Sequence, residues 1–331
     1  MTQIGVVAIG RNEGERLLRC LASATGEGRV LVYVDSGSSD GSVASARERG
    51  AHVVELSREA PFTAARARNA GLERLLEVAP DTEWVQFVDG DCEIVPEWWS
   101  AIARWLPGDP IVAALCGRRR ERSPAASIYN RLCDLEWNTP VGRVGACGGD
   151  ALMRVAALRA VGGFRAELIA GEEPELCFRL RAAGFAIERI GAEMTLHDAA
   201  MTSFAQWWRR AVRAGHAYAE CFALHGHSAE RFRARELRSI LFWGGALPVL
   251  ALASAWLTHG LSLVALIALD EVLWLRVWSA RRRLGDSGPD AAAYATFVVV
   301  GKWAQLVGAA RYAWNRALGR RAGLIEYKAP A

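Results

Sequence analysis

Two aspartates one residue apart, Asp89 and Asp91, are the residues of this sequence best suited to chemistry. They directly follow the apolar run 84–88, with Gly90 between them. Neighbouring carboxylates repel each other, so a cation stabilises the pair, and oxygen ligands of this kind suit Mg²⁺ or Mn²⁺ shared with substrate phosphates. A solvated turn is the ordinary explanation of an isolated Asp-x-Asp sequence. The position after a buried strand favours a metal and phosphate site.

A second acidic pair, Glu172 and Glu173, opens a predicted helix at 172–183. Negative charge is favourable in the first turn of a helix, so pairing with the helix dipole is one explanation. The other is catalysis, because two adjacent carboxylates near a phosphate can keep one pKa high enough for a general base. His197 follows the strand-like segment 193–196 and is a candidate metal or phosphate contact, with simple packing or capping as the alternative.

Asp35 and Arg68 are candidates for contact with a nucleotide. Asp35 ends the predicted strand 30–34, where a carboxylate can accept hydrogen bonds from a base or a ribose. An Asx turn or a helix cap is the alternative for Asp35. Arg68 lies in the predicted helix 62–78, where Gly71 is out of place unless another segment approaches closely. Contact with a phosphate or base competes here with an ordinary surface arginine.

Short strands and helices alternate through the first two thirds of the chain. The apolar runs predict strands at 4–9, 30–34, 52–56, 84–88 and 111–116, and the segments between them predict helices at 13–23, 42–49, 62–78 and 97–105. This alternation predicts an α/β fold with a mostly parallel sheet covered on both faces. Ligands bind at the carboxyl ends of such strands. The loops 10–14, 35–41 and 89–93 should therefore converge on one rim.

Composition adds three constraints on the chain of 331 residues. The net charge of +4 argues against a general nucleic-acid binder, and the arginines are instead clustered, as in 118–120, 231–238 and 281–283. Such clusters beside apolar segments suit anionic headgroups, although solvated helix faces explain them equally well. The seven scattered cysteines include no CxxC pair, which predicts reduced thiols rather than disulfides or a zinc site. The amino terminus lacks the form of a signal peptide, so we expect the soluble part in the cytoplasm.

Seven short segments, in this order, resemble the family 2 glycosyltransferases of the GT-A fold over residues 4–215. They are VVAIGRNEGERL (6–17), VYVDSGSSDGS (32–42), ARNAGL (67–72), QFVDGD (86–91), GGDALMR (148–154), VGGF (161–164) and GEEPELCFRLRAAGF (171–185). Each segment is a weak signal alone, and the shared order makes the match specific. The first loop departs from the family's more common Pro-Thr-Tyr-Asn type, and Arg11 in it is a candidate phosphate contact.

The resemblance implies inverting transfer of a sugar from a nucleotide-diphosphate sugar, with Mg²⁺ or Mn²⁺ as cofactor. It assigns Asp35 to the nucleobase, Asp89 to the ribose and the shell of the metal, and Asp91 to the metal directly, with His197 as a further metal candidate. It assigns catalysis to Glu173 as the base, with Glu172 beside it; Glu173 replaces the usual Asp and precedes Pro174. The residues predicted to bind the donor are Ile9, Arg11, Asn12, Glu13, Asp35, Gly37, Arg68, Asp89, Gly90, Gly149 and Asp150.

The segment 204–210 partly resembles the Gln-x-x-Arg-Trp element of processive members of the family. Arg210 stands where that element has Trp, which argues against processive polymer synthesis. We expect Trp207, Trp208 and Arg210 on the acceptor side. A membrane interface or the packed face of an amphipathic helix explains the two tryptophans equally well.

The last third of the chain changes to long apolar runs. Residues 239–257 contain no formal charge and are just long enough to cross a bilayer, and 261–278 are similar apart from Asp270, Glu271 and Arg276. The two runs predict a membrane hairpin with both ends cytoplasmic, and 291–310 a third apolar segment that lies in the interface or crosses. A helical subdomain packed on the enzyme or in a dimer is the alternative. The predicted domains are 1–215, a basic linker or amphipathic helix at 216–238, and a membrane-associated region at 239–331.

Two other functions remain open at this point. One is a sugar nucleotidyltransferase, which needs a Gly-rich basic phosphate loop that 10–14 only partly supplies. The other is a non-catalytic membrane scaffold with a degenerate nucleotide site. We expect a glycosyltransferase of the inner, cytoplasmic membrane whose catalytic domain faces the cytoplasm. By analogy of fold its acceptor is lipid-linked or belongs to cell-envelope, exopolysaccharide or glycolipid synthesis. A homo-oligomer stays open.

Overall fold

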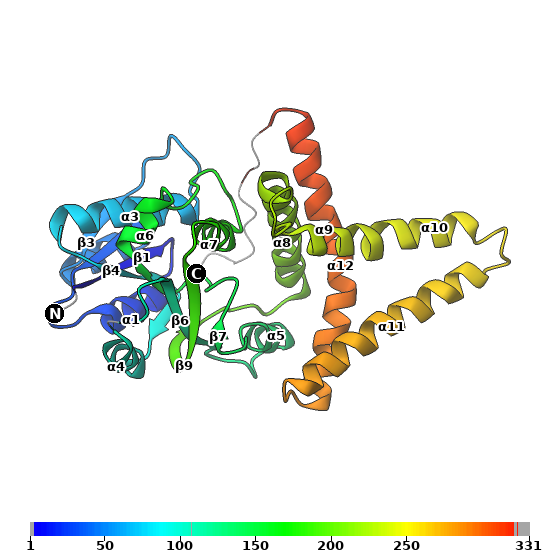
Figure 1. Cartoon of the computed structure of the whole chain (residues 1–331), viewed down its shortest axis with the longest axis horizontal. Helices are drawn as coiled ribbons and strands as arrows, with labels where there is room; N and C mark the ends of the chain where they lie inside the picture. The colour runs from blue at the N-terminus through cyan, green and yellow to red at the C-terminus, as the bar shows by residue number, and fades with distance from the viewer. Residues whose placement is uncertain (1–2, 107, 321–322, 324–331) are drawn as a thin grey trace. The chain divides into compact units, whose positions relative to one another are not determined.

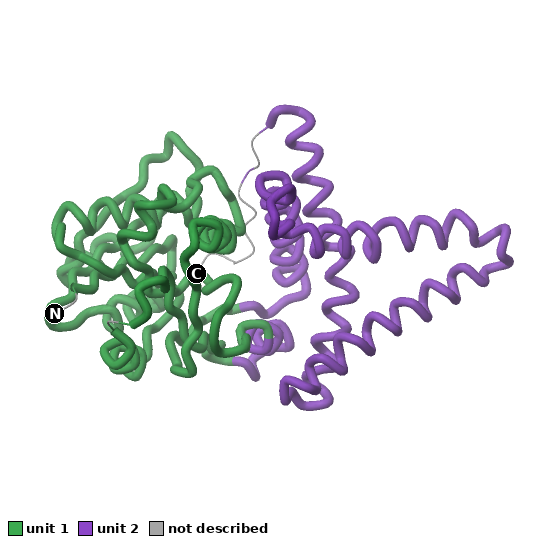
Figure 2. The backbone as a smooth tube through the Cα atoms, in the orientation of Figure 1, with its two compact units in different colours: residues 1–123, 136–200, 329–331 green, residues 124–135, 201–328 purple. Residues whose placement is uncertain are grey.

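The computed structural model describes residues 3–106, 108–320 and 323, which form two compact units (Figure 2). Unit 1 comprises the described residues up to 123 together with 136–200, and unit 2 comprises 124–135 and the described residues from 201 onward. The predicted boundary at residue 215 lies inside a continuous helix, α8 (Phe204–His225). The change to long apolar runs near residue 239 therefore lies within unit 2 and is not the boundary between the two units.

Unit 1 contains the predicted α/β sheet, with helices packed against it (Figure 1). Its first part is parallel, in the order β3 (His52–Glu55), β2 (Leu31–Asp35), β1 (Ile4–Gly10) and β4 (Trp84–Asp89). Helices α1 (Glu15–Ala24), α2 (Ser42–Glu48) and α3 (Ala64–Val78) connect these strands. Val6, Val7 and Ala8 are fully buried in succession, as expected for a strand covered on both faces.

Beyond β4 the sheet is mixed: one further pair of strands is parallel and the others are antiparallel. Strand β8 (Ala151–Arg154) runs antiparallel between β4 and β6 (Val112–Glu121). The long strand β9 (Ala186–His197) lies parallel to β6, and β5 (Cys92–Ile94) and β7 (Gly142–Arg143) pair antiparallel with β9. The remaining helices of this unit are α4 (Pro96–Trp105), α6 (Val155–Ala160) and α7 (Glu172–Ala182), and α5 (Ile128–Glu136) ends in it.

The carboxyl ends of β1, β2 and β4 meet at one rim, as predicted. Ile9 pairs with Asp89 and Gly10 with Asp35, so the loops after these strands start side by side. The same part of the structure explains Gly71 in α3. A Cβ atom there would lie 2.3 Å from Val7 Cγ1 and 2.9 Å from Val34 Cγ2. Glycine thus allows α3 to lie directly on β1 and β2.

The arginine cluster 118–120 belongs to strand β6, and the structure corrects both explanations given for it. Arg118 is buried, and Arg120 forms two hydrogen bonds of 2.7 Å with Glu193 on the neighbouring strand β9. The register of β6 against β9 shifts on either side of Arg118. The strand-like segment 193–196 is the end of the longer strand β9, which pairs with β6 from Ala186 to His197.

Unit 2 is helical and is organised around the contact between α8 and α12 (Gly288–Ala317). The two helices approach at reciprocal glycines. A Cβ atom on Gly215 would lie 2.0 Å from the Gln305 carbonyl oxygen, and one on Gly308 would lie 1.9 Å from that of Val212. Only glycine permits this backbone contact. Small residues at helix crossings are typical of membrane-protein packing.

Three further helices, α9 (Ala234–Ile240), η1 (Leu241–Ala246) and α10 (Leu247–Ser254), form one continuous helix that includes a π-helical turn. Among the described helices, this one of 21 residues is long and apolar enough to cross a membrane, and 11% of its apolar window is buried. Helix α11 (Leu261–Arg283), predicted as the second crossing, carries Asp270, Glu271 and Arg276 within its apolar stretch. Large apolar side chains on α10 and α11 are exposed, including Val249, Leu250, Leu252, Val264 and Ile267.

Candidate active site

Arg68 joins the two acidic pairs that the sequence singled out. Its Nη2 donates to Asp89 Oδ1 at 2.7 Å, and its Nη1 donates to Glu172 Oε1 at 2.8 Å. The guanidinium is 3% exposed and lies 5.6 Å from the Phe164 ring. Burial disfavours the charged form, but the two carboxylates outweigh it and raise the pKa of Arg68. The bridge places the Asp89–Asp91 loop and the start of α7 at one site.

Asn69, next to Arg68, positions the loop before α7. Its side chain accepts from the Phe164 backbone N–H at 2.9 Å and donates to the Phe164 carbonyl at 2.7 Å. The ARNAGL and VGGF segments are therefore one structural unit. Their contact fixes the distance between α3, which carries Arg68, and the chain that leads into α7.

Asp91 and His197 are a candidate pair of metal ligands. Both are buried, and Asp91 Oδ2 lies 3.4 Å from His197 Nε2. The pairing of β5 with β9 sets this contact, since Cys92 is opposite His197 and the Asp198 N–H donates to the Asp91 carbonyl. A carboxylate and an imidazole this close can both reach one divalent cation, so the residues fit the predicted Mg²⁺ or Mn²⁺.

Asp89, the third predicted metal ligand, groups with Asp150 rather than with His197. Asp150 is fully buried. It accepts from the Asp89 backbone N–H at 3.0 Å and from Thr195 Oγ1 at 2.8 Å, and it lies 2.9 Å from Arg119 Nη2. Asp150 thus holds the loop of the aspartate pair in place, which is a positioning role within the predicted donor site.

The loops after β1 and β2 are hydrogen-bonded to each other. The Asn12 N–H donates to Ser38 Oγ at 2.9 Å, and Asn12 Oδ1 accepts from the Ser39 N–H at 2.7 Å. Arg11 lies 5.6 Å from the Phe62 ring, which also packs against Gly37. Glu13 forms an ion pair of 3.0 Å with Arg16. These contacts make a fixed polar edge beside the aspartate pair.

Asp35 is almost fully buried and is engaged within its own loop. Its Oδ2 accepts from the N–H groups of Gly37 and Ser38, at 2.9 Å and 2.8 Å, and its Oδ1 accepts from the Tyr33 hydroxyl at 3.0 Å. Burial, with the nearby Asp35 charge, raises the pKa of Tyr33. The turn explanation of Asp35 therefore describes its contacts in this structure, and a nucleobase contact stays a prediction.

Two predicted donor-site glycines lie where there is little room for a side chain. A Cβ atom on Gly149 would lie 2.7 Å from Asp89 Oδ2 and 2.8 Å from Arg68 Nη2. One on Gly90 would lie 3.1 Å from the Ile9 carbonyl oxygen, which already accepts the Gly90 N–H. The Gly149 backbone thus lies against the ion pair of Arg68 with Asp89, and Gly90 lies against the Ile9 backbone.

Glu173 lies in a pocket with two cysteines. Its Oε1 accepts from the Cys147 backbone N–H at 2.7 Å, from Cys177 Sγ at 3.0 Å and from Cys147 Sγ at 3.2 Å. Glu172, one residue earlier, points to Arg68 instead. The two glutamates therefore have different surroundings, one paired with a cation and one held by an N–H group and two thiols.

The predicted acceptor-side residues belong to unit 2. Trp207 is buried, with its ring 4.7 Å from that of Phe297 on α12 and 5.4 Å from that of Phe204. Trp208 lies 5.7 Å from Phe204, and Arg210 is half-buried. The packed face of an amphipathic helix thus accounts for Trp207, and an acceptor contact by these three residues stays a prediction.

Several residues of the site were missed from the sequence. Arg119 pairs with Asp150 and lies 5.4 Å from the Trp137 ring, which in turn packs 4.7 Å from His197. Burial opposes the Arg119 charge, but Asp150 outweighs it and raises the pKa of Arg119. One signal was present: Arg119 is flanked by arginines at the end of a predicted strand, where alternate side chains face opposite sides of the sheet.

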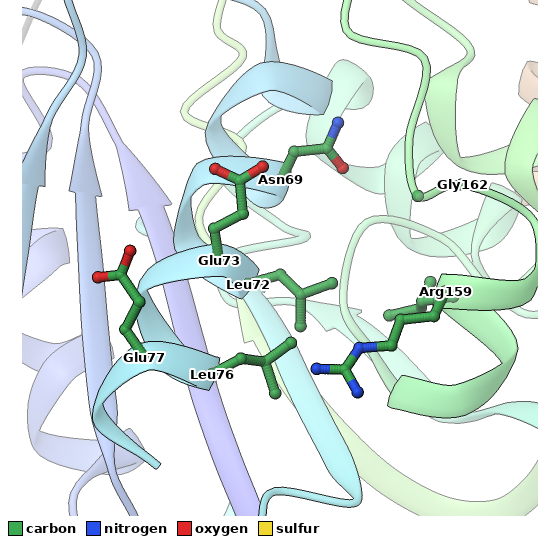
Figure 3. Close-up of a pocket in the computed structure, with 9 residues that line it drawn as sticks. Asn69, Leu72, Glu73, Leu76, Glu77, Arg159 and Gly162 are labelled. Atoms are coloured by element: carbon green, nitrogen blue, oxygen red, sulfur yellow. The ribbon is translucent and has the colours of Figure 1, made fainter. Parts of the chain in front are cut away.

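A separate surface pocket of about 580 Å³ lies between α3 and α6 (Figure 3). Leu72 and Leu76 from α3 and Arg159 from α6 contribute to its lining, with Glu73 and Glu77 at one side. Asn69 and Gly163 also line this pocket, but none of the lining residues that the structure describes is a predicted site residue. We assign the pocket no part in the candidate site.

In unit 1, parallel strands present acidic loops at one rim, beside a helix that begins with two glutamates. Residues 6–159 match the model of glycosyl transferase family 2. A TPR repeat-containing protein of Synechococcus elongatus is 32% identical over 140 residues, which are 42% of this chain and 33% of that protein. The chain thus matches about a third of the length of this relative.

Two solved structures share the fold. The mannosyltransferase PcManGT from Pyrobaculum calidifontis, in complex with GDP-Man and Mn²⁺, is similar with a TM-score of 0.57 and 18% identity, over 95% of this chain and 88% of its own. S. aureus TarS 1–349 is similar with a TM-score of 0.50 and 14% identity, over 94% of this chain and 92% of its own. At these identities the likeness shows the fold.

Proposed function

We propose that this protein transfers a sugar from a nucleotide-diphosphate sugar to an acceptor hydroxyl with inversion at the anomeric carbon. The observation that carries the proposal is the Arg68 bridge. It holds Asp89 and Glu172 on one guanidinium, at 2.7 Å and 2.8 Å, so a donor diphosphate near the aspartate pair lies next to the acidic start of α7. The match of residues 6–159 to the model of glycosyl transferase family 2 supports the reaction class.

Asp91 and His197 would hold the divalent cation, because they are the carboxylate and imidazole that approach each other most closely at the rim. Such a cation neutralises the charge that develops on a leaving diphosphate. Cys92 is beside them as a thiol, since burial raises its pKa well above the ordinary value. The Mn²⁺ and GDP-Man in the solved mannosyltransferase are consistent with this arrangement.

Glu173 is the proposed general base. The Cys147 N–H fixes one oxygen of its carboxylate, and the carboxylate is nearly buried, so its orientation is set before substrate binds. Glu173 accepts the proton of the acceptor hydroxyl as that oxygen attacks the anomeric carbon and the bond to the diphosphate breaks. Arg68 keeps Glu172 paired, which leaves the negative charge of Glu173 as the nearby acceptor of a proton.

The proposed donor site extends from this point to the edge formed by the loops after β1 and β2. Arg11 supplies a positive charge there, and the hydrogen bonds of Asn12 keep the two loops together. A nucleotide bound along this edge places its diphosphate between the loops and the aspartate pair. This orientation follows the general rule that ligands of such sheets bind at the carboxyl ends of the strands.

We further propose that unit 2 anchors the protein in the cytoplasmic membrane, with unit 1 in the cytoplasm and a lipid-linked or cell-envelope acceptor. The apolar helix Ala234–Ser254 has a mean hydropathy of 1.5, and most of it is not covered by protein. The exposed apolar residues of α10 and α11 would otherwise face water. Arginines of the segment 231–238 flank the helix at the expected cytoplasmic end.

Substitution of Asp91 tests the reaction directly. Asp91→Asn keeps the shape of the side chain but removes the charge, and we expect loss of Mn²⁺-dependent release of nucleoside diphosphate from every donor that the wild type uses. Asp109→Asn, an exposed carboxylate of the same unit, is the matched control and should keep its rate. Full activity of Asp91→Asn contradicts the metal assignment. Release of pyrophosphate by the wild type indicates a nucleotidyltransferase instead.

Membrane anchoring is tested with two lysines in the apolar helix. Val249→Lys and Leu252→Lys each place a charge on an exposed apolar position, at a cost of about 2.5–3.5 kcal/mol per lysine near the middle of a bilayer. We expect the double variant to appear in the alkaline extract of membranes while the wild type stays in the pellet. Trp314→Lys, exposed near the end of α12, is the control. Release of the wild type by the same extraction would contradict the proposal.

A further inference from the structure

In unit 1, a cysteine from a loop meets a glutamate and a second cysteine from a helix. Cys147 lies in the loop before β8, and Glu173 and Cys177 are one turn apart on α7. The two Sγ atoms are 3.6 Å apart, and Glu173 Oε1 lies 3.2 Å from Cys147 Sγ and 3.0 Å from Cys177 Sγ. All three side chains thus present a ligand atom to a common point.

These distances are close to those of a thiophilic metal site. Zinc bonds of about 2.3 Å to sulfur and about 2.0 Å to oxygen, at tetrahedral angles, place two sulfurs about 3.8 Å apart and sulfur and oxygen about 3.5 Å apart. The observed separations are shorter by a few tenths of an ångström. Small outward rotations of the side chains would therefore admit a cation, without movement of the backbone.

The chemistry of the ligands also distinguishes this cluster from the site at Asp91. Two sulfurs and one oxygen select soft or borderline cations such as Zn²⁺ or Cd²⁺, whereas Asp91 and His197 offer oxygen and nitrogen. Cys177 and Glu173 are buried, and the half-buried Cys147 is on the accessible side. A bound cation would take a water molecule as its fourth ligand.

We propose that Cys147, Cys177 and Glu173 form a binding site for a thiophilic divalent cation such as Zn²⁺, and that its occupation inhibits transfer by tying up Glu173. The second half rests on the proposed function of Glu173 as the base; the binding itself does not. The cation replaces the two thiol protons, which pass to solvent, and two metal–sulfur bonds and one metal–oxygen bond form. No electrons are exchanged.

This exchange has two consequences. Because two protons leave as the cation binds, apparent affinity rises with pH in the range where the thiols are protonated. The hydrogen bond with Cys177, and then burial, raise the pKa of Cys147, so that range extends above neutral pH. Once its oxygen is bound to the cation, Glu173 no longer accepts a proton from a hydroxyl.

Binding is tested with Cd²⁺, whose bonds to thiolates absorb in the ultraviolet. The full chain, freed of metal by chelation and kept reduced, is titrated with Cd²⁺. We expect a charge-transfer band that saturates at one equivalent, and its loss in Cys147→Ser/Cys177→Ser. Cys221→Ser, which removes a buried thiol of unit 2, should keep the band. Absence of the band in the wild type, or its persistence in the double variant, overturns the site.

Folding of the double variant is checked independently. If Cys147→Ser/Cys177→Ser loses the hydrogen-exchange protection of β1 and β4, the single variant Cys147→Ala replaces it. Cys147→Ala keeps the buried half of the cluster and should weaken Cd²⁺ binding at least tenfold, since one of two thiolates is gone. Unchanged Cd²⁺ affinity in Cys147→Ala overturns the site.

Inhibition is tested with Zn²⁺ in excess Mn²⁺, with the rate of each protein referred to its own rate without Zn²⁺. We expect at least tenfold inhibition of the wild type and of Cys221→Ser, and less than twofold inhibition of a folded cysteine variant. Equal inhibition of all three shows that Zn²⁺ acts at the Asp91 site and refutes the inhibitory role. If no donor supports transfer by the wild type, the proposed function fails, and the Cd²⁺ titration still decides the metal site.

Discussion

Loss of the Arg68 charge should destabilise unit 1 more than most substitutions of a single side chain. Arg68→Met keeps the length and apolar stem of the side chain but leaves Asp89 and Glu172 without their shared cation. The two carboxylates then repel each other in surroundings with little water. Arg68→Lys retains one charge, but an ammonium group cannot span both carboxylates as the planar guanidinium does.

The expected magnitude follows from the exposure of the three groups. Removal of one partner of a buried ion pair costs about 3–5 kcal/mol. Arg68 is 3% exposed, but Asp89 is 29% and Glu172 13% exposed, so water can solvate part of the released negative charge. We therefore expect about 3 kcal/mol for Arg68→Met and a smaller loss for Arg68→Lys.

Hydrogen exchange at the amides of β1 and β4 measures this loss. A single unfolding free energy is poorly defined for a chain with two compact units, whereas exchange of the central strands reports unit 1 alone. A double-mutant cycle with Glu172→Gln separates the ion pair from packing. The cycle should give a coupling of about 1–2 kcal/mol, because Glu172→Gln matters less once Arg68 is gone.

Additive effects would refute this reasoning. If Arg68→Met and Glu172→Gln add to within about 0.5 kcal/mol, the two residues do not interact and the bridge does not join the acidic pairs. A loss below about 1 kcal/mol for Arg68→Met would likewise show that the pair is well solvated. Arg66→Met, which replaces a half-buried arginine two residues away in α3, controls for general effects on the helix.

Three further substitutions test other contacts. Gly149→Ala should displace the ion pair of Asp89 with Arg68 and lower donor affinity in a calorimetric titration, whereas Gly145→Ala, where a Cβ atom has no neighbour closer than 3.9 Å, should leave it unchanged. Gly308→Ala should cost about 1–3 kcal/mol or more by driving α12 from α8, while Gly301→Ala, with only ordinary contacts to Trp207, should be tolerated in the same thermal unfolding assay. Burial, and secondarily Arg311, lowers the pKa of His216 from 6.5 to about 4, so the imidazole is neutral in the folded state. The stability of this state is fully present above pH 6.5 and is lost as the pH falls toward 4. In His216→Leu, the unfolding free energy of unit 2 should therefore depend less on pH between 6.5 and 4, by up to roughly 3 kcal/mol over that range. The same pH dependence in the variant and the wild type would count against the assignment.

Local sequence was enough to predict the first part of the sheet and its rim. The runs that became β1, β2 and β4 are apolar on both faces and end in turn residues, and parallel strands bring their carboxyl ends together. Gly71 was also noted as a position that needs a close approach, and Val7 and Val34 supply it. The strands, their common rim and the close approach at Gly71 all depend on residues near one another in the sequence. The pattern of apolar and turn residues is therefore enough to predict them.

Contacts between distant segments could not be predicted in the same way. The insertion of β8 between β4 and β6 depends on which edge of the sheet is available, and no residue of β8 encodes that choice. Cys147 meets Cys177 across 30 positions, so spacing rules for cysteine pairs did not detect them. Arg119 was grouped with Arg118 and Arg120 because the sequence does not show that Asp150 faces it.

The balance of charge at the site gives a physical reason to expect metal dependence. Among the described residues, Asp89 and Glu172 share the Arg68 guanidinium and Asp150 pairs with Arg119, and Asp91 and Glu173 are two further carboxylates of the candidate site. A donor diphosphate is itself negative, so it would enter an already anionic site at a Coulombic cost that low water content increases. A divalent cation on Asp91 and His197 reverses that cost. When a chelator is present, donor affinity should therefore rise with ionic strength, because salt screens the repulsion between the site and the diphosphate. When Mn²⁺ is present, donor affinity should fall or stay level, because salt then screens an attraction.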